Sequence, residues 1–247
     1  TDLVLGAPQD FMASPSRWVQ WMSDFGGTAT AGPNFSYALA ARALKRLDNL
    51  DLSRWRVALN GAEPVDPATM STFCDAGVRH GFRPTSAFPA FGMAELAIAG
   101  TFPEPDSGLR MDVVDQTCLE RDGFAKQCNP GDGKPFALLG RPVPGLEMRI
   151  CVPGTGAELA DREVGELEFR GTSVTPGYYD HLEATAAAFR GEWLRTGDLA
   201  YRVDGELVVC GRIKDVIIVG GRNVFPEDVE RAASGAEGVR AGNVIAF

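Results

Sequence analysis

Strand and helix patterns alternate through the first hundred residues, and a glycine turn follows the clearest strand. Residues 34–47 repeat apolar side chains at helical spacing, after an earlier helix expected to begin near Ser14 with that hydroxyl as its N-cap. The apolar run of residues 55–60 is typical of a short buried strand; it ends at Gly61, and Asp66 then begins another helix. Repeats of this kind fold as an α/β layer, with ligand-binding groups at the strand ends.

Residues 140–213 have a β-rich pattern instead. Polar and apolar side chains alternate along several short runs, and Asp204-Gly205 is a strong two-residue hairpin signal between two of them. We therefore expect a small distorted barrel or sheet here. Farther on, residues 216–219 predict one more strand, and Pro226 with the acidic residues after it predicts the first turn of a helix.

The segment between these regions, residues 101–139, is interrupted by proline and glycine too often for long regular elements. Only residues 109–113 alternate like a strand. A loop-rich insert of this length inside a compact protein is uncommon and often functional. We therefore divide the chain into an α/β part (1–100), the insert (101–139), a β-rich part (140–213) and the beginning of a small C-terminal α+β domain (214–247).

Charge and hydropathy exclude some classes of function. The 247 residues carry a net charge of −9, which argues against recognition of a nucleic-acid backbone. Neither a membrane-spanning apolar run nor a signal peptide is visible, so we expect a cytoplasmic protein without a membrane span. The cysteines are odd in number and never form a Cys-x-x-Cys pair, which predicts reduced structural thiols: Cys74, Cys118, Cys128, Cys151 and Cys210.

Four motifs in order carry the functional signal: Gly61-Ala-Glu-Pro64, Phe91-Gly-Met-Ala-Glu95, Trp193-Leu-Arg-Thr-Gly-Asp-Leu199, and the stretch that begins with Gly211-Arg-Ile-Lys214. Together they resemble the adenylate-forming superfamily, whose members join a carboxylic acid to AMP before passing the acyl group on. The resemblance covers essentially the whole chain. It implies the later part of the large adenylate-forming domain and the opening of the small C-terminal domain.

Finer details are similar to the fatty acyl-AMP ligase branch. Ala94 stands where many relatives have threonine, so no side-chain hydroxyl can reach a phosphate from this position, and Asn60 also matches that branch. Phe91 stands where tyrosine is usual, so the ring has no phenolic hydroxyl. The insert matches the position of an extra segment that acyl-AMP ligases carry, whose apolar side chains are expected to dock on the large domain: Leu109, Met111, Val113, Val114 and Leu119.

Bringing a carboxylate to a triphosphate requires a cation on the phosphates and a rigid cradle for the nucleoside. Glu95 is the candidate Mg²⁺ residue, because a carboxylate suits a metal already chelated by phosphates. The resemblance implies that Phe91 stacks on adenine and that Asp198 and Arg212 contact the ribose. It also implies a wider set of nucleotide-binding positions: Gly61, Ala62, Glu63, Gly92, Met93 and Ala94.

Each motif also has an ordinary structural interpretation. Gly61–Pro64 could be only a tight turn between strand and helix, Phe91 only a buried ring, and Asp198 only a turn residue. The stretch Gly131-Asp-Gly-Lys134 lacks the spacing of a phosphate-binding loop and is interpreted as a turn. The two histidines, His80 and His181, have no nucleophile signature nearby and are interpreted as structural.

Lys214 follows Gly-Arg-Ile, where relatives carry a hinge residue between the large and small domains. Only four residues of this chain are lysines, so a lysine here is less readily explained as generic surface charge. The resemblance also implies a phosphate loop before this sequence and a catalytic lysine after it. We therefore expect the 247-residue chain alone not to make acyl-AMP at a useful rate.

The leading interpretation is an ATP- and Mg²⁺-dependent fatty acyl-AMP ligase of lipid metabolism. The intact enzyme would pass the acyl group to an acyl carrier protein or to a polyketide synthase carrier domain. One alternative is an ordinary acyl-CoA ligase with coenzyme A as the acceptor. Another, from a different class, is a non-catalytic module that binds nucleotide or a carrier protein. The insert and Ala94 favour the acyl-AMP ligase over the acyl-CoA ligase.

Overall fold

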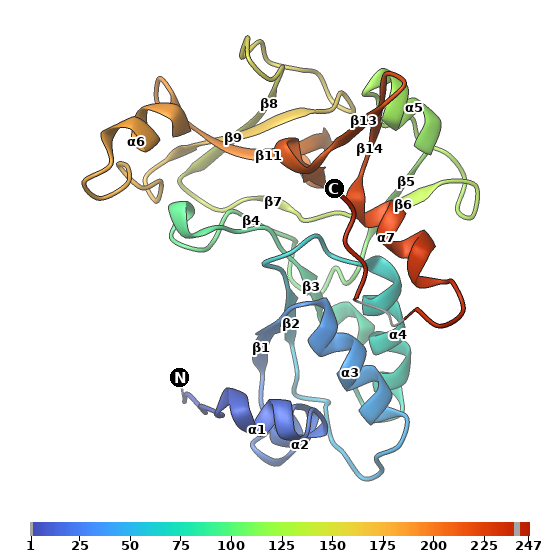
Figure 1. Cartoon of the computed structure of the whole chain (residues 1–247). Coiled ribbons are helices and arrows are strands. Elements are labelled where there is room, and N and C mark those ends of the chain that lie inside the picture. Colours follow the sequence, from blue (N-terminus) through green and yellow to red (C-terminus); the bar gives the residue numbers. More distant parts are fainter. Residues whose placement is uncertain (1, 240–242) are drawn as a thin grey trace. The chain divides into compact units, whose positions relative to one another are not determined.

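The computed structural model describes residues 2–239 and 243–247, and these residues form two compact units (Figure 1). The first unit contains the residues up to Ala94 with Ile98–Asp112 and Phe136–Val143. The second contains Glu95–Ala97, Val113–Pro135 and the chain from Pro144 onward. Glu95 therefore belongs to the second unit, although the four residues before it belong to the first.

The first unit is built on a parallel three-stranded sheet in the order β1-β2-β3. Helix α3 connects β1 to β2, and α4 connects β2 to β3. Right-handed crossovers between successive neighbours place both helices on the same face of the sheet, as Figure 1 shows. The elements are β1 (Ala29–Gly32), β2 (Val57–Asn60), β3 (Ala87–Pro89), α1 (Pro8–Ala13), α2 (Ser16–Asp24), α3 (Asn34–Leu44) and α4 (Pro67–Val78).

Aromatic side chains fill the core of this unit. Trp55 is fully buried and makes edge contacts with Trp18, Phe73 and Phe82, with ring centroids 5.5–5.7 Å apart. Edge-to-face packing of this kind adds to the stabilisation from burial alone. The core therefore fixes α2, α3 and α4 against the sheet, and with them the strand ends where ligand groups are expected.

The second unit is built on an antiparallel five-stranded sheet, in which β12 pairs with β11 beside the order β10-β11-β9-β8. The turn between β11 and β12 is Asp204-Gly205, and both residues have positive φ, 51° and 79°, as a two-residue hairpin of type I′ requires. The elements are β8 (Leu146–Cys151), β9 (Gly165–Gly171), β10 (Phe189–Arg190), β11 (Trp193–Val203), β12 (Glu206–Arg212) and α6 (Leu182–Ala188).

Smaller elements complete the two units. Strand β4 (Thr101–Phe102) pairs with β7 (Arg141–Pro142) in the first. The second contains helix α5 (Gln116–Asp122), the hairpin of β13 (Ile217–Val219) and β14 (Arg222–Val224), and helix α7 (Pro226–Ser234). Strands β5 (Met111–Val114) and β6 (Lys134–Ala137) pair with each other, and each contains a point where the chain passes from one unit to the other.

Most local predictions are confirmed, and two need correction. The predicted N-cap at Ser14 is wrong: α2 begins at Ser16 with Pro15 as its N-cap, and the Ser14 hydroxyl lies 3.0 Å from that of Ser16. Residues 101–139 are also more regular than expected, because they contain α5 and three strands. Of their apolar side chains, Leu109 packs against the first unit's core, Val114 and Leu119 are buried in the second unit, and Met111 is half exposed.

Candidate nucleotide site

The first two motifs lie side by side at the carboxyl ends of two neighbouring parallel strands. Gly61 follows β2 and Phe91 follows β3, and the amide of Ala90 donates to the carbonyl of Asn60 at 2.9 Å. A Cβ on Gly61 would lie 3.0 Å from the Ala90 carbonyl oxygen, so glycine permits this close approach. Ala62 has φ 71°, a left-handed conformation that costs a non-glycine residue about 1 kcal/mol.

Asn34, at the start of α3, organises the loop after β2. Its side chain donates to the carbonyl of Pro64 at 2.7 Å and accepts from the side chain of Asn60 and the amide of Asp66, both at 3.0 Å. Its own backbone amide donates to the Glu63 carboxylate at 2.7 Å. The Glu63 side chain therefore caps a free amide of the helix N-terminus, where an anion is favoured. Sequence reasoning missed Asn34, although Gly-Pro-Asn before a helical pattern is a recognisable helix start.

A closed loop runs from Phe91, just after β3, to Thr101. The amide of Phe91 donates to the carbonyl of Thr101, and the amides of Gly100 and Thr101 donate to the carbonyl of Phe91. Inside the loop, Ile98 has φ 79°, a strained backbone for a β-branched residue. Strain of this kind is concentrated at functional sites, where the surrounding structure holds it in place.

Glu95, at the tip of this loop, is fixed by a segment far along the chain. The amide of Thr175 donates to the Glu95 carbonyl at 2.8 Å, and the Tyr178 hydroxyl donates to Oε1 of the Glu95 carboxylate, also at 2.8 Å. This hydrogen bond is the main cause that raises the pKa of Tyr178, with burial and the Glu95 charge as further causes. Glu95, Thr175 and Tyr178 all belong to the second unit.

The surroundings of Glu95 fit a metal ion that arrives with phosphates. Among the residues that the structure describes, no cluster of three or more His, Cys, Asp or Glu side chains could hold an ion without other ligands. Mg²⁺ is commonly bound through one or two carboxylates together with substrate phosphates and water, rather than in an all-protein cage. A single half-buried carboxylate such as Glu95 is the donor that this arrangement needs.

Asp198 lies in a bulge of the central strand β11. The ladder to β9 pairs Arg195 with Glu168 and then Leu199 with Glu166, so three residues of β11 stand opposite one residue of β9. Gly197 has φ 74°, which suits glycine. Bulges re-aim side chains and are over-represented next to active sites. Here the bulge consists of Thr196-Gly197-Asp198, the core of the third motif.

The bulge is held by the Thr196 hydroxyl. It donates to the carbonyl of Leu167 at 3.0 Å and accepts from the amide of Asp198 at 3.0 Å. The Asp198 carboxylate in turn accepts from Nε of Arg212 at 3.0 Å, and these two residues are register partners on β11 and β12. Burial raises the pKa of Asp198, while the Arg212 charge and the hydrogen bonds from Arg212 and Thr196 oppose that shift.

The predicted site residues are therefore divided between the units. Asp198 and Arg212 form an ion pair in the second unit, which also contains Glu95 and Lys214. Lys214 lies in the short 3₁₀ turn Ile213–Asp215 directly after β12, so it occupies the connection that a hinge would use. The remaining predicted nucleotide-binding residues lie in the first unit: Gly61, Ala62, Glu63, Phe91, Gly92, Met93 and Ala94.

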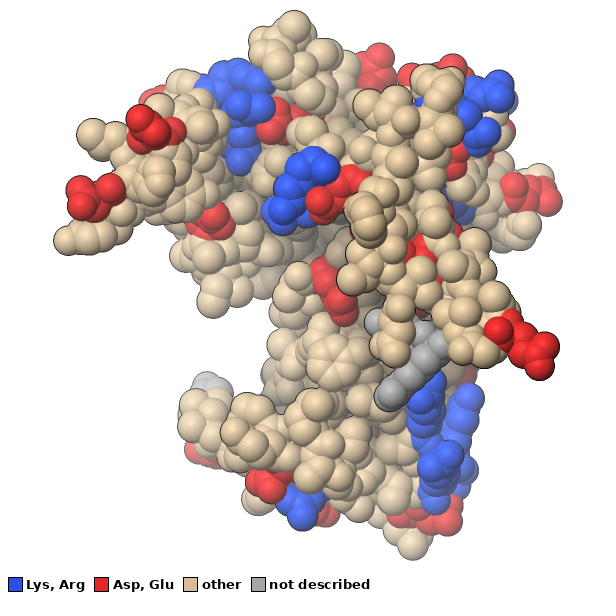
Figure 2. All heavy atoms as spheres, viewed as in Figure 1, with Lys and Arg blue, Asp and Glu red and all other residues tan. Residues whose placement is uncertain are grey.

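The residues interpreted as structural have structural contacts. The His80 ring lies 2.9 Å from the carbonyl of Leu44, and Nδ1 of His181 accepts from the amide of Ala184 as the N-cap of α6. All five cysteines are free thiols. Residues 130–133 form the predicted turn, and Lys134 begins β6. On the face shown in Figure 2, basic side chains lie in separate small groups rather than in one band.

Comparison with known proteins identifies the family. Residues 2–179 match the protein family described as AMP-binding enzyme. The chain belongs to this family. Membership in the AMP-binding enzymes confirms the adenylate-forming resemblance, and the mixed α/β fold matches the adenylate-forming domain of fatty acyl-AMP ligases.

Two individual relatives and one solved structure support the same family assignment. A putative ligase, Rv1013 of Mycobacterium tuberculosis, is 43% identical over 249 residues, covering 99% of this chain and 46% of that protein. JamA of Moorena producens, named a medium-chain-fatty-acid–[acyl-carrier-protein] ligase, is 34% identical over 238 residues, covering 91% of this chain and 40% of that protein. A structure from studies of fatty acyl-adenylate ligases of E. coli and L. pneumophila matches with a TM-score of 0.88 and 34% identity, over 97% of this chain and 44% of that one.

The chain thus spans less than half the length of these AMP-binding relatives. Within residues 2–239 and 243–247, every helix falls short of the length and apolar character that a membrane crossing needs.

Proposed function

We propose that the full-length protein uses ATP to convert a fatty acid into acyl-AMP and pyrophosphate, and then passes the acyl group to an acyl carrier protein. In the first step, a carboxylate oxygen attacks the α-phosphorus and pyrophosphate leaves. The observation that carries the proposal is the buried Asp198, presented by a strand bulge and paired with Arg212. A carboxylate with an adjacent guanidinium can accept from, and donate to, neighbouring ribose hydroxyls.

The proposed roles follow from the chemistry of each position. Asp198 and Arg212 hold the ribose, the Gly61 loop and the Phe91 ring hold the adenine, and Glu95 holds the magnesium ion that accompanies the phosphates. The metal supplies positive charge against the triphosphate. Lys214, in the turn after β12, is the proposed hinge, where a few backbone angles can reorient the following segment.

The identity of the acceptor is the finer part of the proposal. It is supported by two ion pairs between the insert and the elements after the hinge. Nζ of Lys134 lies 2.5 Å from the Asp228 carboxylate of α7, with both side chains largely buried, and 4.9 Å from the centroid of the Phe225 ring. The guanidinium of Arg222 on β14 contacts the carboxylate of Glu120 on α5, which is 4% exposed.

Each pair contains at least one buried charge, Lys134 in the first and Glu120 in the second, although the Arg222 side chain is 42% exposed. Breaking either pair would leave that buried charge without its partner. The two contacts therefore oppose movement of β14 and α7 away from the insert. We expect this restraint to disfavour the rearrangement that transfer to free coenzyme A requires. JamA, a relative of similar sequence, is named a ligase that uses an acyl carrier protein, which agrees with this acceptor.

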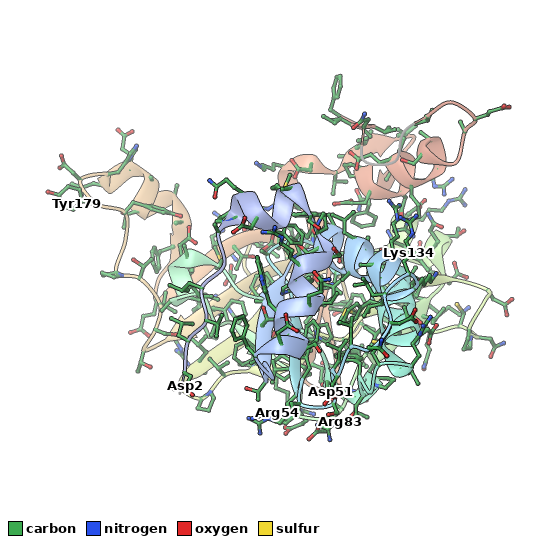
Figure 3. All side chains as sticks on the ribbon, turned by 90° about the horizontal axis from the view of Figure 1, so that it is seen from below. Asp2, Asp51, Arg54, Arg83, Lys134 and Tyr179 are labelled. Carbon is green, nitrogen blue, oxygen red and sulfur yellow. The ribbon has the colours of Figure 1, made fainter. Side chains whose placement is uncertain are left out.

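The adenylation step is tested by ATP–pyrophosphate exchange with a series of fatty acids of different length. The full-length protein should exchange label only when both a fatty acid and Mg²⁺ are present. An Asp198→Ala variant should lose most of the exchange, whereas Asp51→Ala, on an exposed loop, should keep it (Figure 3). Nucleotide binding without any exchange would instead identify a non-catalytic binding module.

The acceptor is tested by comparing acyl transfer to carrier phosphopantetheine and to free coenzyme A. Point substitutions are sharper than deletion of residues 101–139, because deletion also removes the buried Val114 and Leu119. The wild type should use the carrier protein, and Lys134→Met with Arg222→Ala should gain activity with coenzyme A. A preference of the wild type for coenzyme A would identify an acyl-CoA ligase and overturn this part of the proposal.

A further inference from the structure

Tyr178 contacts the candidate metal residue although 83 positions separate them in the sequence. We propose that Tyr178 is a positioning residue for Glu95: its hydroxyl fixes the carboxylate so that Glu95 meets the metal–nucleotide complex in one orientation. This inference rests on the proposed function, because Glu95 is the proposed metal ligand. Tyr178 acts through Glu95 and is not assigned a contact with substrate.

The hydrogen bond leaves the carboxylate able to bind a metal. The Tyr178 hydroxyl engages Oε1 at 2.8 Å, and among the described residues Oε2 accepts no hydrogen bond. A carboxylate oxygen can also accept more than one bond, so the tyrosine contact does not exhaust Oε1. Donation to one oxygen therefore orients the group without occupying the other.

The segment that carries Tyr178 is itself anchored on both sides. On one side, the backbone amide of Tyr178 donates to the hydroxyl of Thr185 on α6 at 2.9 Å. Three residues earlier, the amide of Thr175 donates to the Glu95 carbonyl at 2.8 Å. Gly177 between them has φ 149°, and a Cβ there would lie 2.6 Å from the Thr185 side chain, so the segment needs glycine.

The Thr175–Tyr178 segment thus contacts both the main chain and the side chain of Glu95. A glutamate without such support would have to order its flexible side chain when the metal binds. Outer partners that orient a metal-binding carboxylate typically contribute tenfold to hundredfold in metal affinity. The same range is expected here for loss of the Tyr178 hydroxyl.

The test uses the full-length protein and the pair Tyr178→Phe and Tyr179→Phe. Tyr179 is fully exposed and projects away from the protein, so it controls for removal of a neighbouring hydroxyl (Figure 3). The probe is Mn²⁺, titrated by electron paramagnetic resonance in the presence of ATP. Tyr178→Phe should weaken Mn²⁺ binding tenfold to hundredfold, Tyr179→Phe should match the wild type, and ATP binding in the presence of EDTA should be the same in all three.

A double-mutant cycle with Glu95→Gln separates positioning from a general structural effect. In the Glu95→Gln background, Tyr178→Phe should change Mn²⁺ affinity by less than about twofold, because the group it positions is gone. Equal Mn²⁺ affinity in Tyr178→Phe and wild type, an equal loss in the Glu95→Gln background, or an equal loss of metal-free ATP binding would each overturn the inference alone. Absence of Mn²⁺–ATP binding by the wild type would overturn the proposed function together with this inference.

Discussion

The Asp198 carboxylate accepts a hydrogen bond from Nε of Arg212 at 3.0 Å, and the two residues face each other across the hairpin of β11 and β12. The acid is 8% exposed, whereas nearly half of the arginine side chain is exposed. Burial raises the pKa of Asp198 despite the nearby positive charge. The folded chain therefore keeps a carboxylate in a position that disfavours its charged form, which is expected of a residue retained for binding.

Asp198→Asn should separate binding from stability. Because burial raises the pKa of Asp198 in the folded chain above its ordinary value of 3.8, the wild type loses stability as the pH rises from that ordinary value through the folded pKa. The neutral variant avoids this loss, so its Tm without nucleotide should equal or exceed that of the wild type at pH 7. Its advantage should disappear near pH 3.5. A variant that is less stable than the wild type at pH 7 would contradict the argument.

Nucleotide affinity should change in the opposite direction. A hydrogen bond to a charged group is worth about 1.5–3 kcal/mol, so Asp198→Asn should weaken ATP binding by about tenfold to a hundredfold. Isothermal titration of the full-length protein measures this directly. A stabilised variant with intact ATP affinity would remove Asp198 from the ribose site.

Local patterns predicted the parts of the fold that local interactions determine. The two-residue Asp204-Gly205 turn and the helix that begins at Pro67 depend on backbone preferences of neighbouring residues, and both are present. Helix α5 was missed because the prolines and glycines around it outweighed its own signals. Those signals are Asp115, whose side chain accepts from the amide of Cys118, and Gly123, which ends the helix in a left-handed conformation.

Long-range contacts could not be predicted in this way. Lys134 and Asp228 are 94 positions apart, and neither has a neighbour that indicates the other. The bond from Tyr178 to Glu95 is equally invisible, because a single tyrosine after a glycine is typical of many loops. Motif resemblance predicted the candidate site residues, whereas the residues that hold them in position could be identified only from the folded structure.

Asn34→Ala should destabilise the first unit by about 2–4 kcal/mol. The substitution removes the acceptor of the fully buried Asn60 side-chain amide, and an unsatisfied buried donor costs about 1–3 kcal/mol. The backbone amide of the half-buried Asp66 loses its acceptor as well. ATP affinity should fall as well, because the Gly61 loop loses its support. Urea unfolding measures the first effect. Glu63→Gln, which keeps an oxygen for the Asn34 amide, is the control and should cost less than about 1 kcal/mol.

Gly92→Ala should disrupt the loop between Phe91 and Thr101. An added Cβ would lie 1.7 Å from the carbonyl oxygen of Ile98, so the backbone must move. Overpacking of this kind typically costs about 1–3 kcal/mol, and nucleotide binding should fall with it. Gly235→Ala is the matched control: φ is −79° and the nearest contact is 3.4 Å, so its stability should change by less than about 1 kcal/mol. Equal effects of the two substitutions on the urea midpoint would contradict the conclusion that close packing at residue 92 requires glycine.

Lys134→Met should destabilise the second unit far more than loss of an exposed ion pair. The substitution leaves the carboxylate of Asp228, whose side chain is 16% exposed, with the more distant Arg231 at 3.8 Å as its remaining ion-pair partner within the part of the chain that the structure describes. Removing one partner of a buried pair costs about 3–5 kcal/mol, and the partial exposure of Asp228 places the expected loss at the lower end.

Arg79→Ala, which breaks the exposed pair with Asp48, should cost no more than about 1 kcal/mol. The double variant Lys134→Met with Asp228→Leu should recover part of the loss, because no charge is then left unpaired in the interior. If Lys134→Met and Arg79→Ala have the same urea midpoint, the Lys134–Asp228 contact does not hold α7 to the insert, and the structural basis for the proposed acceptor preference is lost.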